Sequence, residues 1–447
     1  MQRIDEALEA FESVSRVLLA ELWEYTEPYA AALPDARFAA GLQLLVAGML
    51  AARSPQLAKA AAHTPQADQD ETALAKRFYR LLNTPRFSHR QWLKLLYADA
   101  RQIVEDSDVD RVIVALDPVN LEKAYAERIE GISTVYKSTP PGSLPRREGR
   151  LTKGYPALLA YIVNLSQPAI SYARLFSYTT PDFLSENREL VRAMRTIRVV
   201  IPERTVCLVT DSVLDDQKMF AWAGQYGLEF ITRATSERWI EVYNERLDRW
   251  ELEKLMEIVS ILPGRLRFKT GFIHEGKLTI AQVTLDWFQM RIPDTTQDLW
   301  VIVAETDHFP DLLVLITNRP ARSAADARAI YSDWRRRPTI ELYYRFVQED
   351  GLDVEKIQLQ KLERIRREFI LILALSLFVL RLPDVWHPSL ILWFRRLGSA
   401  TAGTDSDWNG PYLLLCGIQR VLSAWSVFLA ALKLPLHLLP TCAQPFG

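Results

Sequence analysis

The chain has 447 residues, of which 49% are hydrophobic, which is long and apolar enough for two or three globular domains with cores of their own. Its 54 lysines and arginines are balanced by 55 aspartates and glutamates, so bulk electrostatic attraction to nucleic acid is excluded and any DNA contact has to use local basic patches. Three widely separated cysteines and six scattered histidines fit neither a disulfide framework nor a zinc finger.

The first sixteen residues carry acidic side chains where a secretion signal would have a basic start and an apolar core. The most apolar run, Phe369–Leu380, is well short of the roughly 20 residues that a membrane helix needs. We therefore expect a cytoplasmic protein without a membrane span, in which this run forms a buried helix.

The first part of the chain has helical periodicity and lacks the alternation of strands. The predicted helices are Ile4–Tyr25, Asp35–Ala52, Gln56–Ala62, Asp70–Leu82 and Ser88–Ile103, so residues 1–105 are expected to form an all-α domain. Arg77 and Arg80, next to Phe78 and Tyr79, form a basic and aromatic cluster that suits phosphate contact. The alternative is a solvated helix face whose two aromatic rings point into the core.

From Val112 the pattern changes to short apolar runs that are typical of strands. These runs are Val112–Leu116, Ile132–Tyr136, Ala157–Leu165, Ile170–Phe176, Cys207–Thr210 and Phe230–Thr232, with a helix at about residues 182–199. Strands mixed with helices predict an α/β sheet of the ribonuclease H type, assigned to residues 106–236 and 306–365. The loop from Ser138 to Lys153 carries Arg146 and Arg147, and it either grips a DNA backbone or serves as a mobile connector.

Residues 237–305 exceed what such a sheet needs, which indicates an inserted β-rich subdomain. Its predicted strands are Trp239–Tyr243, Trp250–Ile258, Arg265–Ile273, Leu278–Met290 and Leu299–Glu305. Residues 366–447 are predicted to form a helical C-terminal region.

Two of the predicted strands end in aspartates, Asp117 and Asp211, and a third carboxylate, Glu341, lies on a predicted aromatic-rich helix. Carboxylates held at the rim of a sheet are suited to Mg²⁺, and two clamped ions stabilise the attacking and leaving oxygens of phosphoryl transfer. A lone aspartate after an apolar run is more often a turn or helix-cap residue. The hypothesis therefore rests on the three carboxylates taken together.

The order and spacing of these residues resemble the bacterial insertion-sequence DDE transposases of the insertion-sequence-four group, which carry a Tyr-x2-Arg-x3-Glu-x6-Lys motif. The resemblance runs through Val112–Asp117, Cys207–Asp211, Tyr226–Arg233 and Leu312–Pro320 to Glu341. It implies a cut-and-paste transposase in which Asp117, Asp211 and Glu341 hold two Mg²⁺ ions, which Mn²⁺ can replace. It also implies double-stranded DNA as partner, both transposon terminal inverted repeats and target, and a homodimer in a synaptic complex. By the same resemblance, residues 1–105 are expected to be a DNA-binding domain, and the protein to be associated with the bacterial nucleoid when it binds DNA.

The chain departs from the motif at two positions and from some relatives at a third. The motif arginine is Arg337, but Trp334 stands at the tyrosine position and Gln348 at the lysine position. Some relatives use a tryptophan to take a flipped base, and here that position is Leu313, which offers no ring for stacking. The residues predicted to contact DNA around the third carboxylate are Tyr331, Trp334, Arg335, Arg336, Arg337, Arg345 and Gln348, in addition to Lys153, Arg146, Arg147, Arg77 and Arg80.

Two other functions stay open on the sequence. The departures from the motif also suit a domesticated, catalytically weak DNA-binding protein derived from a transposase. The carboxylates alone suit a ribonuclease-H-like nuclease without strand transfer.

Overall fold

The computed structural model describes residues 2–65, 70–124, 126, 128–137, 151–234, 238–274, 277–307, 312–402 and 410–432. The chain divides into two compact units, each built from separate stretches of sequence. Unit 1 comprises residues 1–96, 125–132 and 344–447, and unit 2 comprises residues 97–124 and 133–343. The predicted segments 106–236 and 237–305 thus fall largely together in unit 2, and the predicted N-terminal and C-terminal helical regions contribute to unit 1.

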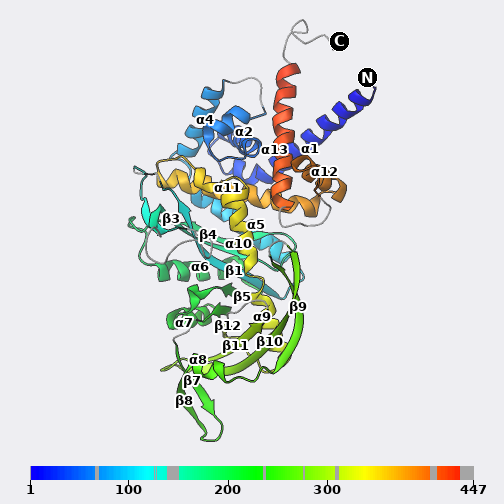
Figure 1. Cartoon of the computed structure of the whole chain (residues 1–447). Helices are drawn as coiled ribbons and strands as arrows, with labels where there is room; N and C mark the ends of the chain where they lie inside the picture. Colours follow the sequence, from blue (N-terminus) through cyan, green and yellow to red (C-terminus); the bar gives the residue numbers. More distant parts are fainter. Residues whose placement is uncertain are drawn as a thin grey trace. The chain divides into compact units, whose positions relative to one another are not determined.

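Unit 1 is helical (Figure 1). Its helices are α1 (Gln2–Ala31), α2 (Ala36–Ala52), α3 (Leu57–His63), α4 (Glu71–Asn83), the first part of α5 (His89–Glu105), α11 (Leu362–Val385), α12 (Pro388–Gly398) and α13 (Gly410–Leu432). Asp35 begins α2 because its carboxylate accepts hydrogen bonds from the backbone N–H groups of Arg37 and Phe38. The five predicted N-terminal helices are confirmed, and the run Phe369–Leu380 is confirmed as part of a buried helix, α11.

A buried arginine of α11 fixes the connection between α4 and α5. Arg367 is 4% exposed, and its guanidinium donates to the backbone carbonyls of Leu82 (2.8 Å), Thr84 (2.9 Å) and Phe87. Its Nε donates to Glu363, one turn earlier on the same helix, at 3.3 Å. The carbonyls of an irregular segment are thereby satisfied inside unit 1, where water does not reach them.

Glu363 in turn holds the start of α5. Its carboxylate accepts from the backbone N–H of His89 at 2.9 Å and contacts the His89 ring Nδ1 at 2.6 Å. Burial acts to raise the pKa of Glu363, but the hydrogen bonds from His89 and the charge of Arg367 outweigh it and lower that pKa to about 2.

Unit 2 is organised around one mixed sheet with the strand order β2-β3-β1-β5-β6-β12-β11-β10-β7-β8, with β4 paired to β3 and β9 to β10. The strands are β1 (Arg111–Glu122), β2 (Ser133–Tyr136), β3 (Leu151–Ile162), β4 (Ala169–Leu175), β5 (Thr205–Thr210), β6 (Glu229–Arg233), β7 (Trp239–Asn244), β8 (Arg249–Lys254), β9 (Leu266–His274), β10 (Lys277–Arg291), β11 (Asp298–Thr306) and β12 (Leu313–Thr317). β1, β5 and β6 are parallel neighbours, and β3 is antiparallel to β1.

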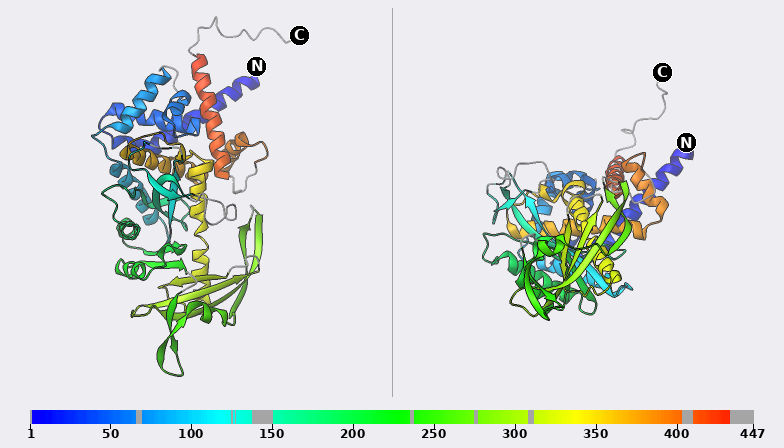
Figure 2. Two further views of the ribbon diagram at one scale, coloured as in Figure 1. Left: turned by 60° about the vertical axis from the view of Figure 1, so that its left-hand side comes forward. Right: turned by 60° about the horizontal axis from the view of Figure 1, so that its bottom comes forward.

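The strands of the predicted insertion continue this sheet. β12 pairs with β6 on one side and with β11 on the other, so β11 and β10 extend the sheet without a break. The first half of β10 pairs with β9 and its second half with β11, and β7 and β8 form a hairpin at the end of the sheet (Figure 2).

Different helices of unit 2 cover the two faces of the sheet. On one face, α6 (Glu186–Val200), α7 (Gln217–Gln225) and the end of α5 bury a core that includes Val114, Leu116 and Leu208. On the other face lie α9 (Ala324–Trp334) and the start of α10 (Pro338–Arg345), and the ring of Tyr343 stacks on Tyr161 of β3 at 4.7 Å. A mixed α/β fold is therefore confirmed.

One predicted strand is wrong in its second half. The run Trp250–Ile258 was expected to be extended throughout, but β8 ends at Lys254 and residues 255–260 form the short helix α8. Leu255 and Val259 are buried and lie four residues apart, which is the spacing of one helix face. The predicted basic loop, with Arg146 and Arg147, lies outside the described residues except for residues 151–153, which belong to β3 and include Lys153.

By length and composition, one described stretch, Gly410–Leu429 of α13, is able to cross a membrane, with a mean hydropathy of 1.5. The helices α2 and α3, taken together, are also long and apolar enough, but the angle between them is 89°. Core helices of globular proteins can have the same length and hydropathy, and 44% of the α13 stretch is buried inside the structure. The finding does not place the chain in a membrane.

Replacing Arg367 with methionine is expected to lower the free energy of unfolding by about 2–4 kcal/mol, because the carbonyls of Leu82, Thr84 and Phe87 lose their donors. Arg364→Met is the matched control, since Arg364 is a partly exposed arginine of the same helix. Urea unfolding followed by circular dichroism measures both variants. Equal stabilities for the two variants would contradict the role given to Arg367.

Candidate active site

The pairing of β1 with β5 brings the first two predicted carboxylates together. The two strands are parallel, and their last aligned residues are Ala115 and Val209. Continuing this register by two residues sets Asp117 beside Asp211, which directly follows β5. The sequence predicted that the strand ends at Asp117. In the structure β1 continues past it and pairs with β3, which sets Asp117 opposite Leu159.

The alternation of side chains along β1 decides which face carries Asp117. Val112, Val114 and Leu116 point into the core beneath α6 and α7, so Asp117 belongs to the opposite face. That is the face on which α9 and α10 lie, which is why Glu341 of α10 reaches the same place.

Several hydrogen bonds fix the backbone around Asp211. The Trp334 indole Nε1 donates to the carbonyl of Thr210 at 3.1 Å, and the hydroxyl of Thr232 donates to the carbonyl of Asp211 at 2.5 Å. The Arg233 guanidinium lies 4.0 Å from the Asp211 carboxylate. Trp334, predicted to contact DNA, therefore anchors the end of α9 to the strand that presents Asp211.

Arg337 lies between the first and third carboxylates. Its Nη1 contacts Oε1 of Glu341 at 2.6 Å, and its Nη2 lies 3.6 Å from Oδ1 of Asp117. The pair with Glu341 has the helical spacing of four residues, and Pro338 opens α10 between them, as the sequence predicted. The Arg337 side chain is 13% exposed, whereas those of Glu341 and Asp211 are 55% and 42% exposed.

Burial and charge change the acidity of this cluster. Burial raises the pKa of Asp117 to about 6, with help from the negative charges of Glu341 and Asp211 and against the opposing charge of Arg337. For Arg337 burial acts to lower the pKa, but the three carboxylates outweigh it and raise that pKa above its ordinary value. The cluster as a whole therefore favours a cation among its oxygens.

The oxygen donors of Asp117, Asp211 and Glu341 suit a hard divalent cation such as Mg²⁺. Among the described residues, however, no three His, Cys, Asp or Glu side chains lie close enough together to hold a metal ion. The Arg337 guanidinium instead lies between Asp117 and Glu341. The carboxylate oxygens suit a metal ion in their chemistry, and the described side chains would have to move closer together to hold one.

Two other acidic residues near Asp211 have structural roles. Asp215 is buried and pairs with the Arg238 guanidinium. Asp216 begins α7, since its carboxylate accepts from the backbone N–H groups of Lys218 (2.8 Å) and Met219 (3.4 Å). Asp215 is thus bound to an arginine and Asp216 caps a helix, so both carboxylates differ from that of Asp211, which is half exposed.

The other residues predicted near the third carboxylate are placed differently from one another. Tyr331 is buried at 4% exposure and packs edge-on against Phe268, with ring centroids 6.1 Å apart. Arg335 donates to the hydroxyl of Thr270 at 3.4 Å, whereas Arg336 is exposed. The burial of Tyr331 leaves Arg336 as the more accessible of these groups.

The remaining predicted contacts fall elsewhere. Lys153 is exposed on β3 of unit 2. Arg345 and Gln348 belong to unit 1, where the Gln348 amide donates to Glu355 at 3.4 Å. In α4, Arg80 is exposed, and Arg77 donates to the carbonyl of Arg37 at 3.1 Å.

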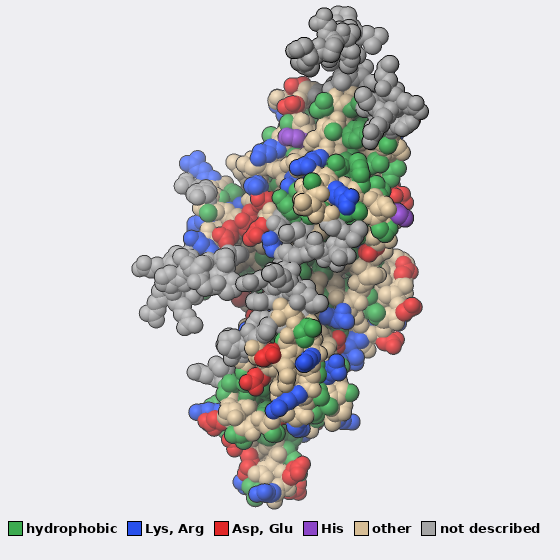
Figure 3. All heavy atoms as spheres, turned by 45° about the vertical axis from the view of Figure 1, so that its right-hand side comes forward, with side chains coloured by type: hydrophobic (Ala, Val, Ile, Leu, Met, Phe, Trp, Pro, Cys, Tyr) green, Lys and Arg blue, Asp and Glu red, His purple; other side chains and the backbone are tan. Residues whose placement is uncertain are grey.

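The aromatic neighbours of that α4 cluster are divided between core and surface. Phe78 is fully buried, whereas Tyr79 is 39% exposed. On the face shown in Figure 3, Lys and Arg side chains are interspersed with Asp and Glu, in keeping with the near-zero net charge.

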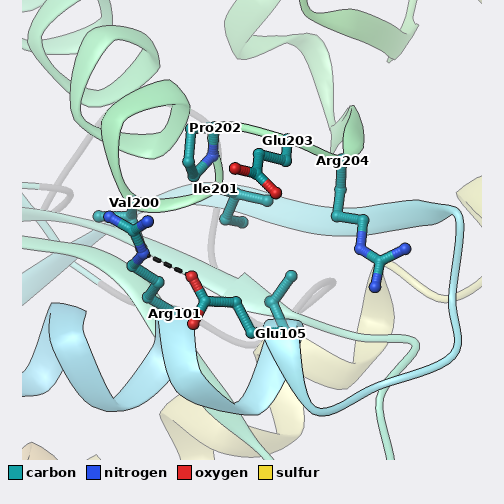
Figure 4. Close-up of a pocket in the computed structure, with 8 residues that line it drawn as sticks. Arg101, Glu105, Val200, Ile201, Pro202, Glu203 and Arg204 are labelled. Carbon is teal, nitrogen blue, oxygen red and sulfur yellow. Dashed lines mark hydrogen bonds and ion pairs between the residues drawn. The ribbon is translucent and has the colours of Figure 1, made fainter.

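A hollow of about 370 Å³ in unit 2 lies away from the carboxylates (Figure 4). Its lining includes Arg101 and Glu105 of α5, which form a 2.7 Å ion pair, together with Glu203 and Arg204. Arg204 immediately precedes β5, whereas Asp211 immediately follows it, so the strand of about 20 Å separates the two. The hollow is therefore distinct from the candidate active site.

Sequence reasoning missed two features of the site. The anchoring of the Thr210 carbonyl by Trp334 joins residues 124 positions apart and has no local signal. The position of Arg337 beside Glu341 had a signal, the spacing of four residues on a predicted helix, but its approach to Asp117 depends on the tertiary fold.

No protein-family model matches the sequence, and no curated protein matches it. Among solved structures, a piggyBac transposase in a synaptic complex with hairpin DNA aligns over 94% of this chain and 80% of that chain, with 8% identity and a TM-score of 0.41. The prediction that the chain belongs to the insertion-sequence-four group rests on the sequence motif.

Asp117→Asn is expected to stabilise the metal-free protein at pH 8 and to have little effect at pH 4. Because the folded state raises the Asp117 pKa to about 6, it binds a proton more tightly than the unfolded chain, and stability falls as pH rises from about 4 to 6. The asparagine side chain does not ionise, so the variant avoids this fall in the free energy of unfolding, which amounts to about 1–3 kcal/mol above pH 6. Urea unfolding at pH 4 and pH 8, with a chelator present, measures the change in the free energy of unfolding that Asp117→Asn causes. An equal gain in stability at the two pH values would contradict the prediction.

Proposed function

We propose that the chain is a DNA transposase of the DDE type, in which Asp117, Asp211 and Glu341 bind two divalent metal ions, Mg²⁺ or Mn²⁺. In this proposal unit 2 contains a ribonuclease H-type catalytic sheet, and the substrates are the terminal inverted repeats of a transposon and a target DNA. The protein cuts at the transposon ends and joins the 3′ ends to the target, working as a homodimer in a synaptic complex.

The observation that carries the proposal is that Arg337 interacts with three carboxylates that are far apart in sequence. The parallel register of β1 and β5 aligns Asp117 with Asp211, and Arg337 contacts both Asp117 and Glu341. Against the effect of burial, the three carboxylates raise the pKa of Arg337, and burial raises that of Asp117. A group whose pKa is shifted by burial and by neighbouring charges is characteristic of functional sites, which supports the proposal.

When bound, two divalent ions supply stabilisation of the attacking and leaving oxygens of a phosphodiester. The chain's own residues supply the rest. Trp334 and Thr232 hold the backbone that carries the Asp211 carboxylate, through hydrogen bonds to the carbonyls of Thr210 and Asp211. The exposed Arg336, next to the site in sequence, is a candidate for binding a backbone phosphate.

A second function is favoured by one specific observation. Arg337 lies between Asp117 and Glu341, and no described group of three donors is close enough to hold an ion. A transposase-derived DNA-binding protein that has lost cleavage would have such a site. A nuclease without strand transfer shares the carboxylates and differs only in the joining step.

Purified full-length protein is expected to nick DNA that carries its own terminal repeats when Mg²⁺ or Mn²⁺ is present. Glu341→Gln and Asp117→Asn are each expected to reduce cleavage at least about 100-fold, because a metal ligand is lost, while DNA binding survives. Denaturing gels measure cleavage, and gel shifts measure binding. Glu305→Gln, an exposed carboxylate of β11, is the matched control that should cut normally.

The assay separates the three functions. Nicking followed by joining to a target plasmid is the outcome required of a transposase, and nicking without joining would indicate the nuclease. DNA binding without cleavage in any metal, unchanged in Asp117→Asn, would exclude the transposase in favour of the DNA-binding protein.

A further inference from the structure

The candidate site already contains a positive charge, which is the side chain of Arg337. The Arg337 guanidinium lies 2.6 Å from Glu341 and 3.6 Å from Asp117, and the charge of Asp211 also acts on it. Three acidic groups close to one another repel unless a positive charge offsets them. In this structure Arg337 provides that charge.

The guanidinium is incompletely satisfied where it lies. Its Nε is buried and has no hydrogen-bond partner within the described part of the chain. An arginine that binds a carboxylate or phosphate with its full fork uses two parallel hydrogen bonds of about 2.7–2.9 Å. Arg337 therefore uses one strong hydrogen bond, to Glu341, and its Nε would gain a partner on meeting an anion with a suitable fork of oxygens.

We propose that Arg337 is a resident counter-ion that competes with divalent metal ions for the carboxylates Asp117 and Glu341. A metal ion binds only as the guanidinium leaves these oxygens, and the freed guanidinium is then available to a phosphate oxygen of the substrate. This inference rests on the proposed function, because it requires that the carboxylates take a metal ion. It assigns Arg337 a second role besides the DNA contact expected from the sequence.

The neighbouring arginine provides a matched control for this competition. Arg336 carries the same charge one residue away, but it is exposed and no ion pair to a carboxylate of the site is found for it among the described residues. Arg336→Gln and Arg337→Gln change the net charge equally. Only the second substitution removes the group that contacts Asp117 and Glu341.

The test is direct Mn²⁺ binding to full-length protein without DNA, with free Mn²⁺ measured by electron paramagnetic resonance. Arg337→Gln is expected to bind Mn²⁺ at least tenfold more tightly than the wild type, and Arg336→Gln to bind it within about twofold of the wild type. Asp117→Asn is expected to lose this binding. Equal or weaker binding by Arg337→Gln would overturn the competition while leaving the metal site intact.

A second measurement covers the case in which loss of the buried side chain perturbs the fold. Arg337→Ala leaves a space into which free guanidinium fits, so guanidinium chloride at tens of millimolar should weaken Mn²⁺ binding to this variant severalfold. The same concentration of sodium chloride should not, and the wild type should respond equally to the two salts. An Arg337→Ala variant that is insensitive to guanidinium would contradict the proposal.

Failure of the proposed function looks different from failure of this inference. If wild type, Arg337→Gln and Asp117→Asn all lack Mn²⁺ binding, the carboxylates are not a metal site and the competition falls with it. If the wild type binds Mn²⁺ in an Asp117-dependent way and Arg337→Gln binds no better, only the competition is wrong.

Discussion

The parallel pairing of β1 with β5 is the constraint on which the candidate site depends. It aligns Asp117 with Asp211 although 94 positions separate them in the sequence. Because side chains alternate across a strand, a slip of one residue would move Asp117 into the core beneath α6 and α7. The buried residues Val112, Val114 and Leu116 prevent that slip, since they would then face the other way. The hydrophobic core thus fixes the position of a polar group.

The charge balance at the site follows from this arrangement. Asp117 is largely buried on a strand, which opposes its ionisation, and two further carboxylates add to the opposition. Arg337 offsets part of this charge, but it does so in a place where its own Nε has no partner among the described residues. Folded proteins commonly break rules of local satisfaction where they act on a ligand. The Nε of Arg337 is one of several buried side-chain atoms without a hydrogen-bond partner among the described residues, and it lies beside the candidate carboxylates. The buried Arg367 of unit 1 differs, because backbone carbonyls accept from its Nη groups.

Much of the secondary structure could be predicted from the sequence, because it is encoded by local periodicity. The N-terminal helices, the strands around Asp117 and Asp211, and the start of α10 at Pro338 all follow from such patterns. The strand Trp250–Ile258 failed because Leu255 and Val259 satisfy a helical spacing as readily as an extended one. The sequence predicted an inserted β-rich subdomain at residues 237–305 but not how its strands pair, and β12 joins β11 to the same sheet as β6. Strand pairing across such distances leaves no local signal.

The sequence by itself determined which residue types are available: two aspartates at apolar runs, a glutamate on a helix, and an arginine four positions before it. These features depend only on neighbours within a few residues, so periodicity and spacing reveal them. Only the tertiary structure decided that the carboxylates share one face of the sheet, that Trp334 anchors the strand before Asp211, and that Arg337 lies between Asp117 and Glu341. Those outcomes depend on strand register and on the packing of α9 and α10, which are set by contacts between distant parts of the chain.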